Sequence, residues 1–231
     1  MILHSGGIDT PVKAVLFDLD DTLVKTRIDY AALKNAMLAL AAQAKVDCQG
    51  AATQDALSIV RYACAEIERS DNGDGARAAA FRDLAFDRLE QIEAQGCEDA
   101  VPISGAPEWT NALSAAHVKI GVVTRNCRRL AESLLATASI AHDVLYSRND
   151  VAVTKPDPRH LWVALDALNT PPEQTIMVGD HWLDVMAGKA AGCLATIGVL
   201  GTHNPSWFDP APPDLFVRDL ADAHRQLGPL V

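Results

Sequence analysis

VKAVLFDLDDTLV, residues Val12–Val24, is the most informative stretch of the 231-residue sequence. Its first half is a short continuous apolar run, which is typical of a parallel strand buried on both faces. The run ends abruptly in Asp18, Asp20 and Asp21, and carboxylates at the end of a buried strand are costly unless something compensates their charge. Residues two apart in an extended chain point the same way, so Asp18 and Asp20 are expected to face one pocket. Because Mg²⁺ prefers oxygen ligands, the stretch predicts a magnesium site there.

The sequence after this stretch changes to a helical pattern. Apolar residues recur there at the three- and four-residue spacing of amphipathic helices, and β-type runs are almost absent. We therefore expect a helical insertion at residues 27–103, which the chain enters and leaves at one loop region of a first domain. That first domain is expected to combine residues 1–26 with residues 104–231.

Strands and helices alternate from Pro107 onward. The apolar runs that predict strands lie at residues 120–123, 144–146, 176–178, 194–197 and 215–217. Strands separated by helices imply βαβ units with right-handed crossovers, and hence an α/β fold with a parallel sheet. Ligands of such sheets bind beyond the carboxyl ends of the strands, where Asp18, Thr124 and Asp180 are all expected. Asn126 is expected to N-cap the helix that follows Thr124.

Composition limits the partners of the protein. The formal net charge of −10 argues against a nucleic-acid backbone, since proteins that bind one usually carry a basic patch, but it is compatible with a small phosphorylated substrate. The five cysteines are dispersed and form no CxxC pair, which is typical of reduced thiols in a cytoplasmic protein. We expect no secretory signal and no membrane span, because no suitable apolar run occurs. Nothing in the sequence indicates an oligomeric state.

Four segments resemble, in order, the four motifs of the haloacid dehalogenase (HAD) superfamily. They are DLDDT at Asp18–Thr22, GVVT at Gly121–Thr124, the pair Lys155-Pro156, and GDHWLD at Gly179–Asp184. The helical insertion after the first motif is similar to the cap of the subgroup that includes phosphoglycolate phosphatase-like and β-phosphoglucomutase-like proteins. The resemblance implies a three-layer, Rossmann-like α/β core with a parallel sheet and an inserted α-helical cap.

The resemblance also implies roles for the acidic residues. Asp18 is the expected nucleophile, whose attack on phosphorus gives an aspartyl-phosphate and splits one difficult step into two easier ones. Asp20 is expected to protonate the leaving alkoxide and then to deprotonate the attacking water. The expected Mg²⁺ ligands are Asp18, Asp180 and the backbone carbonyl of Asp20.

The other motif residues are expected to act on the phosphate group. Thr124 offers a hydroxyl, and Arg125 beside it is a further candidate for phosphate binding because of its charge. Lys155 is expected to supply positive charge to Asp18 and to the transferring group. Two roles stay open for Asp184: it either binds the metal through water or orients Lys155.

Together the motifs imply a Mg²⁺-dependent phosphatase that acts on small phosphorylated metabolites. Asp20 favours phosphoryl transfer over halide removal, because the halide-removing members of the superfamily generally lack it. Two alternatives stay open, namely a phosphomutase of the β-phosphoglucomutase type and a non-catalytic binding protein of the same fold. The complete set of motif residues speaks against the binding protein, because a decayed site usually loses one of them.

Overall fold

The structure, a computed structural model, describes residues 11–51, 53–70 and 75–228. The described residues form two compact units. One unit contains the residues up to Thr26 and from Ala100 onward, and we call it the α/β unit; the other is Arg27–Asp99, and we call it the helical unit. Among the described residues, no helix combines the length and the apolar character that crossing a membrane requires.

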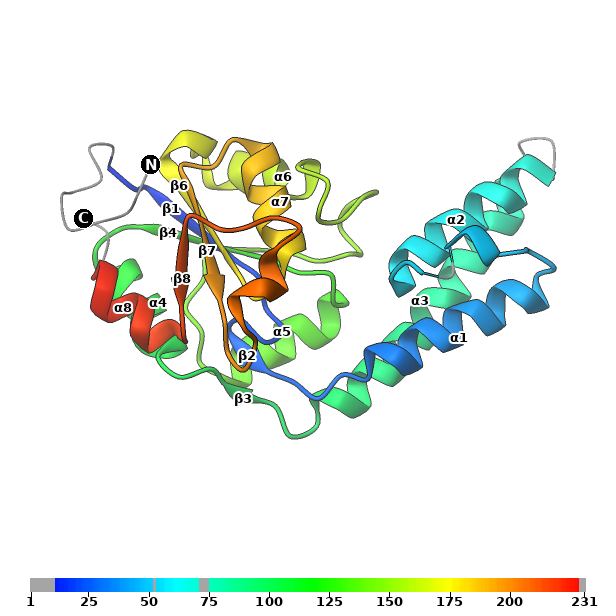
Figure 1. Ribbon diagram of the computed structural model, residues 1–231, viewed down its shortest axis with the longest axis horizontal. Helices are drawn as coiled ribbons and strands as arrows, with labels where there is room; N and C mark the ends of the chain where they lie inside the picture. The colour runs from blue at the N-terminus through cyan, green and yellow to red at the C-terminus, as the bar shows by residue number, and fades with distance from the viewer. Residues whose placement is uncertain (1–10, 52, 71–74, 229–231) are drawn as a thin grey trace. The chain divides into compact units, whose positions relative to one another are not determined.

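A six-stranded parallel sheet forms the centre of the α/β unit (Figure 1). Its strands are β1 (Ala14–Phe17), β4 (Lys119–Val123), β5 (Val144–Tyr146), β6 (Thr175–Gly179), β7 (Ala195–Val199) and β8 (Leu215–Val217). Their order across the sheet is β5-β4-β1-β6-β7-β8, and every neighbouring pair is parallel. Parallel neighbours need crossover connections, which the intervening helices provide. The predicted Rossmann-like α/β core is thereby confirmed.

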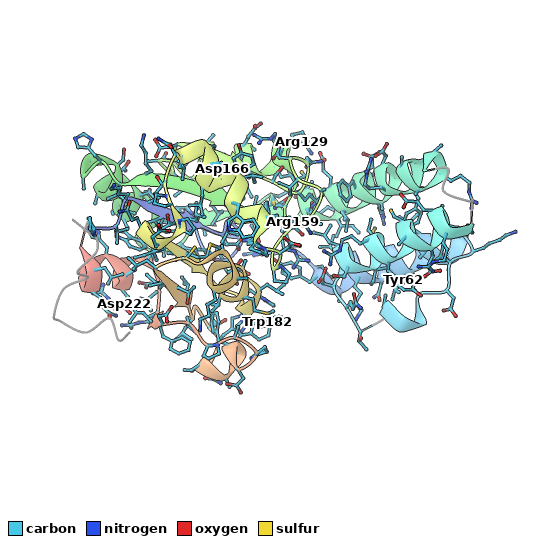
Figure 2. The ribbon with its side chains drawn as sticks, turned by 90° about the horizontal axis from the view of Figure 1, so that it is seen from above. Tyr62, Arg129, Arg159, Asp166, Trp182 and Asp222 are labelled. Atoms are coloured by element: carbon cyan, nitrogen blue, oxygen red, sulfur yellow. The ribbon has the colours of Figure 1, made fainter. Side chains whose placement is uncertain are left out.

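Helices cover both faces of this sheet. They are α4 (Ala106–Ala115), α5 (Arg128–Thr137), α6 (Arg159–Leu168), α7 (Trp182–Ala191) and α8 (Leu220–Leu227). Figure 1 shows α6 and α7 on one face and α4, α5 and α8 on the other. Their exposed sides carry charged residues, among them Arg129 of α5 and Asp166 of α6, both labelled in Figure 2. The apolar sides of these helices therefore face the sheet, as expected for amphipathic helices.

Strand β1 is central because it is apolar on both faces. All four of its residues are buried, and it pairs with β4 on one side and with β6 on the other. Leu16 belongs to an apolar cluster that includes Leu161 of α6 and Ala187 of α7. Phe17 meets Trp109 of α4 edge to face, with 5.4 Å between the ring centroids. Since successive residues of a strand point to opposite faces, β1 is covered from both sides.

The helical unit is built from three helices around an apolar core. They are α1 (Tyr30–Gln43), α2 (Ala56–Ser70) and α3 (Ala76–Cys97), with a short 3₁₀ turn, η1 (Gln49–Ala51), between the first two. Buried residues from all three helices form the core, including Leu33, Met37, Ile59, Ile67, Phe81 and Leu89. Asp29 caps α1 by accepting the N–H of Ala32 at 2.8 Å, and Asp55 caps α2 by accepting the N–H of Ser58 at 3.0 Å.

The chain enters and leaves the helical unit through neighbouring segments of backbone. Within the α/β unit, β2 (Val24–Lys25) pairs with β3 (Val101–Pro102) in antiparallel fashion, so Lys25 lies opposite Val101. Within the helical unit, the N–H of Arg27 donates to the carbonyl of Gly96 at 2.8 Å. Gly96 is required there, because a Cβ at this position would lie 2.6 Å from the Cα of Ile28. Each unit therefore keeps its own two chain ends close together.

Candidate active site

The motif residues meet at the carboxyl edge of the sheet. Asp18 follows β1, Thr124 follows β4 and Asp180 follows β6, and these three strands are adjacent. The backbone continues the sheet pattern for one more residue, since the N–H of Asp18 donates to the carbonyl of Val178 at 2.9 Å. This edge is where parallel α/β sheets bind ligands, and the strand order explains why residues distant in sequence gather there.

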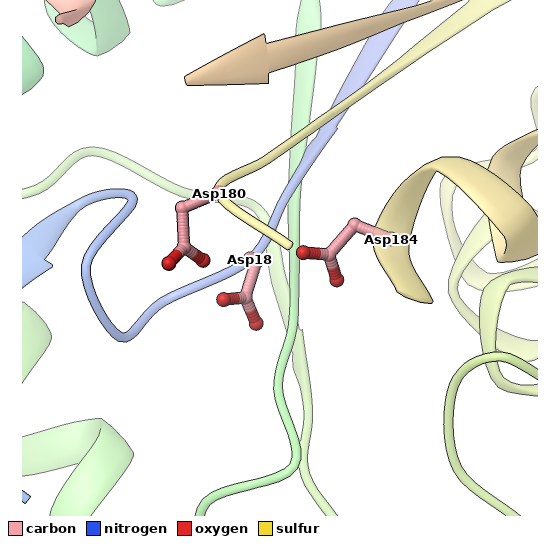
Figure 3. A group of neighbouring side chains, drawn as sticks. All are labelled: Asp18, Asp180 and Asp184. Carbon is pink, nitrogen blue, oxygen red and sulfur yellow. The ribbon is translucent and has the colours of Figure 1, made fainter. Parts of the chain in front are cut away.

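Three carboxylates form an acidic cluster at this edge (Figure 3). They belong to Asp18, Asp180 and Asp184, and one oxygen from each lies within 4.8 Å of the others. Asp184 stands in the first turn of α7, where the positive end of the helix dipole favours a carboxylate. Gly179 lets α7 approach the strand end, because a Cβ at this position would lie 2.4 Å from Cβ and Cγ of Asp184. A glycine is therefore needed at position 179 because the side chain of Asp184 packs directly against it.

Lys155 is the cation that faces this cluster. Its Nζ lies 2.6 Å from Oδ1 of Asp18 and 2.7 Å from Oδ1 of Asp184, and its side chain is 1% exposed. Burial alone would lower the pKa of Lys155, but the two carboxylates outweigh it and raise that pKa. The sequence left two roles open for Asp184, namely binding a metal through water and orienting Lys155. The structure contains the ion pair with Lys155 that the second role requires. The second oxygen of Asp184 accepts the N–H of His181 at 3.1 Å, which fixes the carboxylate.

One lysine does not balance the cluster. Burial raises the pKa of Asp18 to about 6 against the pull of Lys155, with Asp184 adding to the rise. Burial also raises the pKa of Asp180 well above its ordinary value, and the charge of Asp18 adds to the effect. The hydroxyl of Thr22 donates to Oδ1 of Asp180 at 3.3 Å, but it brings no charge. The cluster consists of oxygen donors with an excess of negative charge, so its residues fit a hard divalent cation.

Asp20 is held separately from this cluster. The side-chain amide of Asn126 lies at its carboxylate, with Nδ2 3.1 Å from Oδ1 and 3.2 Å from Oδ2. The prediction that Asn126 N-caps the next helix is wrong: Cys127 occupies the N-cap position of α5, and Asn149 from the β5–α6 loop accepts the N–H of Arg128 instead. The tertiary contact with Asp20 decides where the Asn126 side chain points, and it was invisible in the local sequence.

Thr124 and Arg125 occupy the loop after β4. Thr124 is fully buried, and its hydroxyl oxygen accepts the N–H of Asn126 at 3.0 Å. Arg125 is partly exposed, and its carbonyl accepts a hydrogen bond from Nη1 of Arg148 at 3.1 Å. These contacts order the loop that lies between the strand end and α5.

His160 supports Lys155 and had no sequence signal. Its ring is fully buried in α6, and Nδ1 accepts the backbone N–H of Lys155 at 3.2 Å. Burial lowers the pKa of His160 to about 3, and the charge of Lys155 lowers it further, whereas the Tyr146 backbone acts in the opposite direction. The imidazole is therefore neutral near pH 7, with its proton on Nε2 because Nδ1 is the acceptor. No helical or strand periodicity distinguishes such a histidine from an ordinary core residue.

Trp207 supports Asp180 from the short 3₁₀ helix η3 (Pro205–Phe208). Its indole Nε1 donates to the backbone carbonyl of Asp180 at 3.0 Å. The ring stacks on His203 with 4.4 Å between centroids, and it meets His181 edge to face at 5.1 Å. His181 also lies 5.1 Å from Trp182 at the start of α7, which is labelled in Figure 2. The sequence could not connect this tryptophan with the motif, since 27 positions separate it from Asp180.

Comparison with known proteins identifies the relatives of this chain. A family model described as haloacid dehalogenase-like hydrolase matches residues 15–199. The N-acetylmuramic acid 6-phosphate phosphatase of Pseudomonas aeruginosa is 31% identical over 183 residues, which cover 78% of this chain and 79% of that protein. The validoxylamine A 7′-phosphate phosphatase of Streptomyces hygroscopicus subsp. limoneus is 35% identical over 133 residues, or 56% of this chain and 61% of that protein.

Solved structures share the fold at lower identity. A HAD family hydrolase from Deinococcus radiodurans R1, with bound phosphate and sodium, superposes with a TM-score of 0.63 at 21% identity. The match covers 96% of this chain and 97% of that one. This likeness extends over both units of the chain and supports the topology described above.

Proposed function

The chain belongs to the haloacid dehalogenase-like hydrolase family and is a phosphoric monoester hydrolase, and we propose that it cleaves small phosphorylated metabolites through an aspartyl-phosphate with the help of Mg²⁺. One observation carries this proposal: the carboxylates of Asp18 and Asp20, both in the first motif, contact different side chains. Asp18 is paired with the ammonium of Lys155 at 2.6 Å, whereas Asp20 faces the neutral amide of Asn126. Two carboxylates in different environments suit two different tasks.

Asp18 is the proposed nucleophile. One of its carboxylate oxygens attacks phosphorus, the bond from phosphorus to the leaving oxygen breaks, and an acyl phosphate forms on the side chain. Lys155 holds the carboxylate in place and stabilises the negative charge that spreads over the transferring group. Asp184 orients Lys155 through the 2.7 Å ion pair, which keeps the ammonium between the two carboxylates.

Asp20 is the proposed proton carrier. In the first step it gives a proton to the leaving alkoxide, and in the second step it takes a proton from the water that attacks the acyl phosphate. The second step restores Asp18 and releases inorganic phosphate. Asp20 is partly exposed while Asp18 is nearly buried, so substrate oxygen and water have access to the group that must exchange protons.

The other motif residues are proposed to hold metal and phosphate. Asp18 and Asp180, with the backbone carbonyl of Asp20, would hold Mg²⁺, because the donors are all oxygen and their negative charge exceeds that of one lysine. When bound, the ion would neutralise charge on the phosphate and on the cluster. Thr124 and Arg125 are proposed to face the phosphate from the loop after β4.

The helical unit is proposed to act as a cap, with residues 27–103 as the inserted segment. A cap of this kind limits the size of the substrate and excludes water during phosphoryl transfer. The substrate is accordingly proposed to be a small molecule. The two relatives named above are named for two different phosphate monoesters. We therefore expect substrate selectivity to differ among members of this family.

A metal and product assay tests the proposed reaction. Release of inorganic phosphate from 4-nitrophenyl phosphate should disappear in EDTA and return with Mg²⁺, and Asp180→Asn should remain inactive in both conditions. Full activity in EDTA after exhaustive dialysis contradicts the metal requirement. An isomerised sugar phosphate in place of free phosphate would identify a phosphomutase instead.

A trapping experiment tests the two aspartates. Asp18→Asn should form no phosphoenzyme with any substrate, whereas Asp20→Asn should accumulate it with acetyl phosphate because the hydrolysis step lacks its base. Rapid mixing followed by intact mass measurement reports the added phosphoryl group. Phosphoryl label on a histidine or serine, or on Asp18→Asn, shows that Asp18 is not the nucleophile.

A further inference from the structure

We propose that Asn126 is a positioning residue that holds the carboxylate of Asp20 for proton transfer; this role rests on the function proposed above. Nδ2 of Asn126 lies within hydrogen-bond distance of both carboxylate oxygens, at 3.1 and 3.2 Å. The asparagine is 3% exposed, so water does not compete for its amide. A buried amide that reaches both oxygens of one carboxylate restricts the rotation of that group about its last bond.

The orientation of the amide follows from its second contact. Oδ1 of Asn126 accepts the backbone N–H of Cys127 at 2.7 Å. In the flipped orientation, the NH₂ group would face that N–H and the oxygen would face two carboxylate oxygens, so both contacts would be repulsive. The NH₂ group therefore points at Asp20, because only this orientation satisfies both contacts.

The backbone of Asn126 is fixed as well as its side chain. Its N–H donates to Oγ1 of Thr124 at 3.0 Å, and its carbonyl accepts the N–H of Arg148 at 3.3 Å. Asn126 stands three residues beyond β4, and Asp20 stands three residues beyond β1, which is paired with β4 in parallel. Asn126 and Asp20 therefore follow two adjacent strands, β4 and β1, and this pairing brings their side chains together.

The leaving group of the substrate tests this role. An aryl phosphate such as 4-nitrophenyl phosphate leaves without an acid, whereas an alkyl phosphate such as glycerol 2-phosphate needs one. In Asn126→Ala, phosphoenzyme formation measured by rapid quench should fall by roughly 10- to 100-fold with the alkyl phosphate, a part of the full worth of a positioned acid. With the aryl phosphate it should fall by no more than about threefold. Equal losses with both substrates overturn the proposal.

A double-mutant cycle separates positioning from a general structural effect. If Asn126 acts through Asp20, adding Asn126→Ala to Asp20→Asn should cause no further loss with the alkyl phosphate. Multiplicative losses in the double variant overturn the proposal. Asn126→Asp provides a second variant should the alanine variant unfold, because it keeps the acceptor for Cys127 and replaces the donor that faces Asp20. It should show the same preference for the aryl phosphate, and loss of that preference refutes the role.

Asn149→Ala is the matched control. Asn149 likewise accepts a backbone N–H at the start of α5, that of Arg128 at 3.0 Å, but its side chain is exposed. This control should leave the ratio of aryl to alkyl rates unchanged, and an equal change in that ratio would show that only helix capping matters. Absence of phosphoenzyme from the unsubstituted protein would refute the proposed function itself, whereas phosphoenzyme on Asp18 with no Asn126 effect would refute the positioning role alone.

Discussion

The interiors of the two units differ in what they bury. Among the described residues of the helical unit, Glu93 is the one charged side chain that is buried, and the remainder of the core is nearly all apolar. The α/β unit buries charged residues of both signs at the carboxyl edge of its sheet, namely Asp18, Arg148, Lys155 and Asp184.

This difference indicates which buried residues stabilise the fold and which serve the reaction. Replacing a buried ion pair by apolar residues is often neutral or stabilising, so such pairs are poor explanations of a fold. The apolar core of the helical unit is sufficient for three packed helices. The charges of the α/β unit are therefore best explained by chemistry, and substitutions there are expected to affect activity far more than comparable substitutions in the helical unit.

The largest effect is expected for Lys155→Met. It should lower kcat by roughly 10²–10³-fold, because the transferring group loses an electrostatic partner. It should also lower the free energy of unfolding by about 3–5 kcal/mol at pH 7, because Asp18 and Asp184 stay buried without their cation. Steady-state kinetics and urea unfolding measure the two effects. Lys119→Met, at the exposed start of β4, is the control and should change both quantities very little; equal behaviour of the two variants would show that burial at the carboxyl edge gives Lys155 no special role.

A smaller effect is expected when the helical unit is removed. Lys25 lies opposite Val101 in the β2–β3 pair, so residues 26–100 can be replaced by Asn-Gly, the loop that best closes a two-residue hairpin. The excised protein should fold and should hydrolyse 4-nitrophenyl phosphate within about tenfold of the full chain, while discrimination among metabolite phosphates falls by about 10- to 100-fold. Circular dichroism and a substrate panel provide the measurements. A folded excised protein that keeps the original substrate ranking would show that selectivity resides in the α/β unit.

A pH effect is expected from the raised pKa of Asp18. Burial raises the pKa of Asp18 to about 6 in the folded protein, whereas the unfolded chain releases this proton near the ordinary aspartate pKa of 3.8. The contribution of Asp18 to stability is therefore greatest below the unfolded pKa and is lost as the pH rises to about 6. Urea unfolding in EDTA between pH 4 and 7 should show this loss as a difference between the unsubstituted protein and Asp18→Asn.

The same proton competes with a cation. Apparent Mg²⁺ affinity, measured by calorimetry, should decrease as the pH falls below about 6, because the ligand must lose its proton before it binds. Asp166→Asn, an exposed carboxylate on α6, should leave both pH dependences unchanged. A Mg²⁺ affinity that is constant from pH 5 to 7 would contradict the raised pKa of the cluster.

The smallest effect is expected for His160→Leu. Loss of the acceptor for the Lys155 N–H should lower kcat by roughly threefold to tenfold, the equivalent of one neutral hydrogen bond. The free energy of unfolding should also fall, by about 1–3 kcal/mol, because the buried backbone N–H of Lys155 is left without its acceptor. Thr170→Val, which removes a buried hydroxyl just beyond the other end of α6, should lower stability without lowering kcat. An equal loss of kcat in Thr170→Val would show that the effect of His160 on kcat is a general effect of destabilisation and does not act through Lys155.

The sequence predicted the parts of the site that depend on strand ends. Asp18 and Asp180 each follow an apolar strand, and the crossover rule for βαβ units places such strands side by side in one sheet. Lys155 required the family resemblance, because a lysine in a loop has no structural signal of its own. The prediction for Asn126 failed because a local capping preference competed with a tertiary contact, and only the pairing of β1 with β4 brings Asp20 into reach.

Trp207 gives the protein an optical signal at the site. Its indole N–H is bonded to the carbonyl of Asp180, and its ring touches His181, so a change in motif IV alters the surroundings of an exposed fluorophore. Trp109 and Trp162 donate to the backbone carbonyls of Gly228 and Ala191, and Trp182 remains beside His181 when Trp207 is replaced, so the difference between the two proteins isolates Trp207. Emission that is lost in Trp207→Phe can therefore follow cation and phosphate arrival in real time, without a label and without turnover.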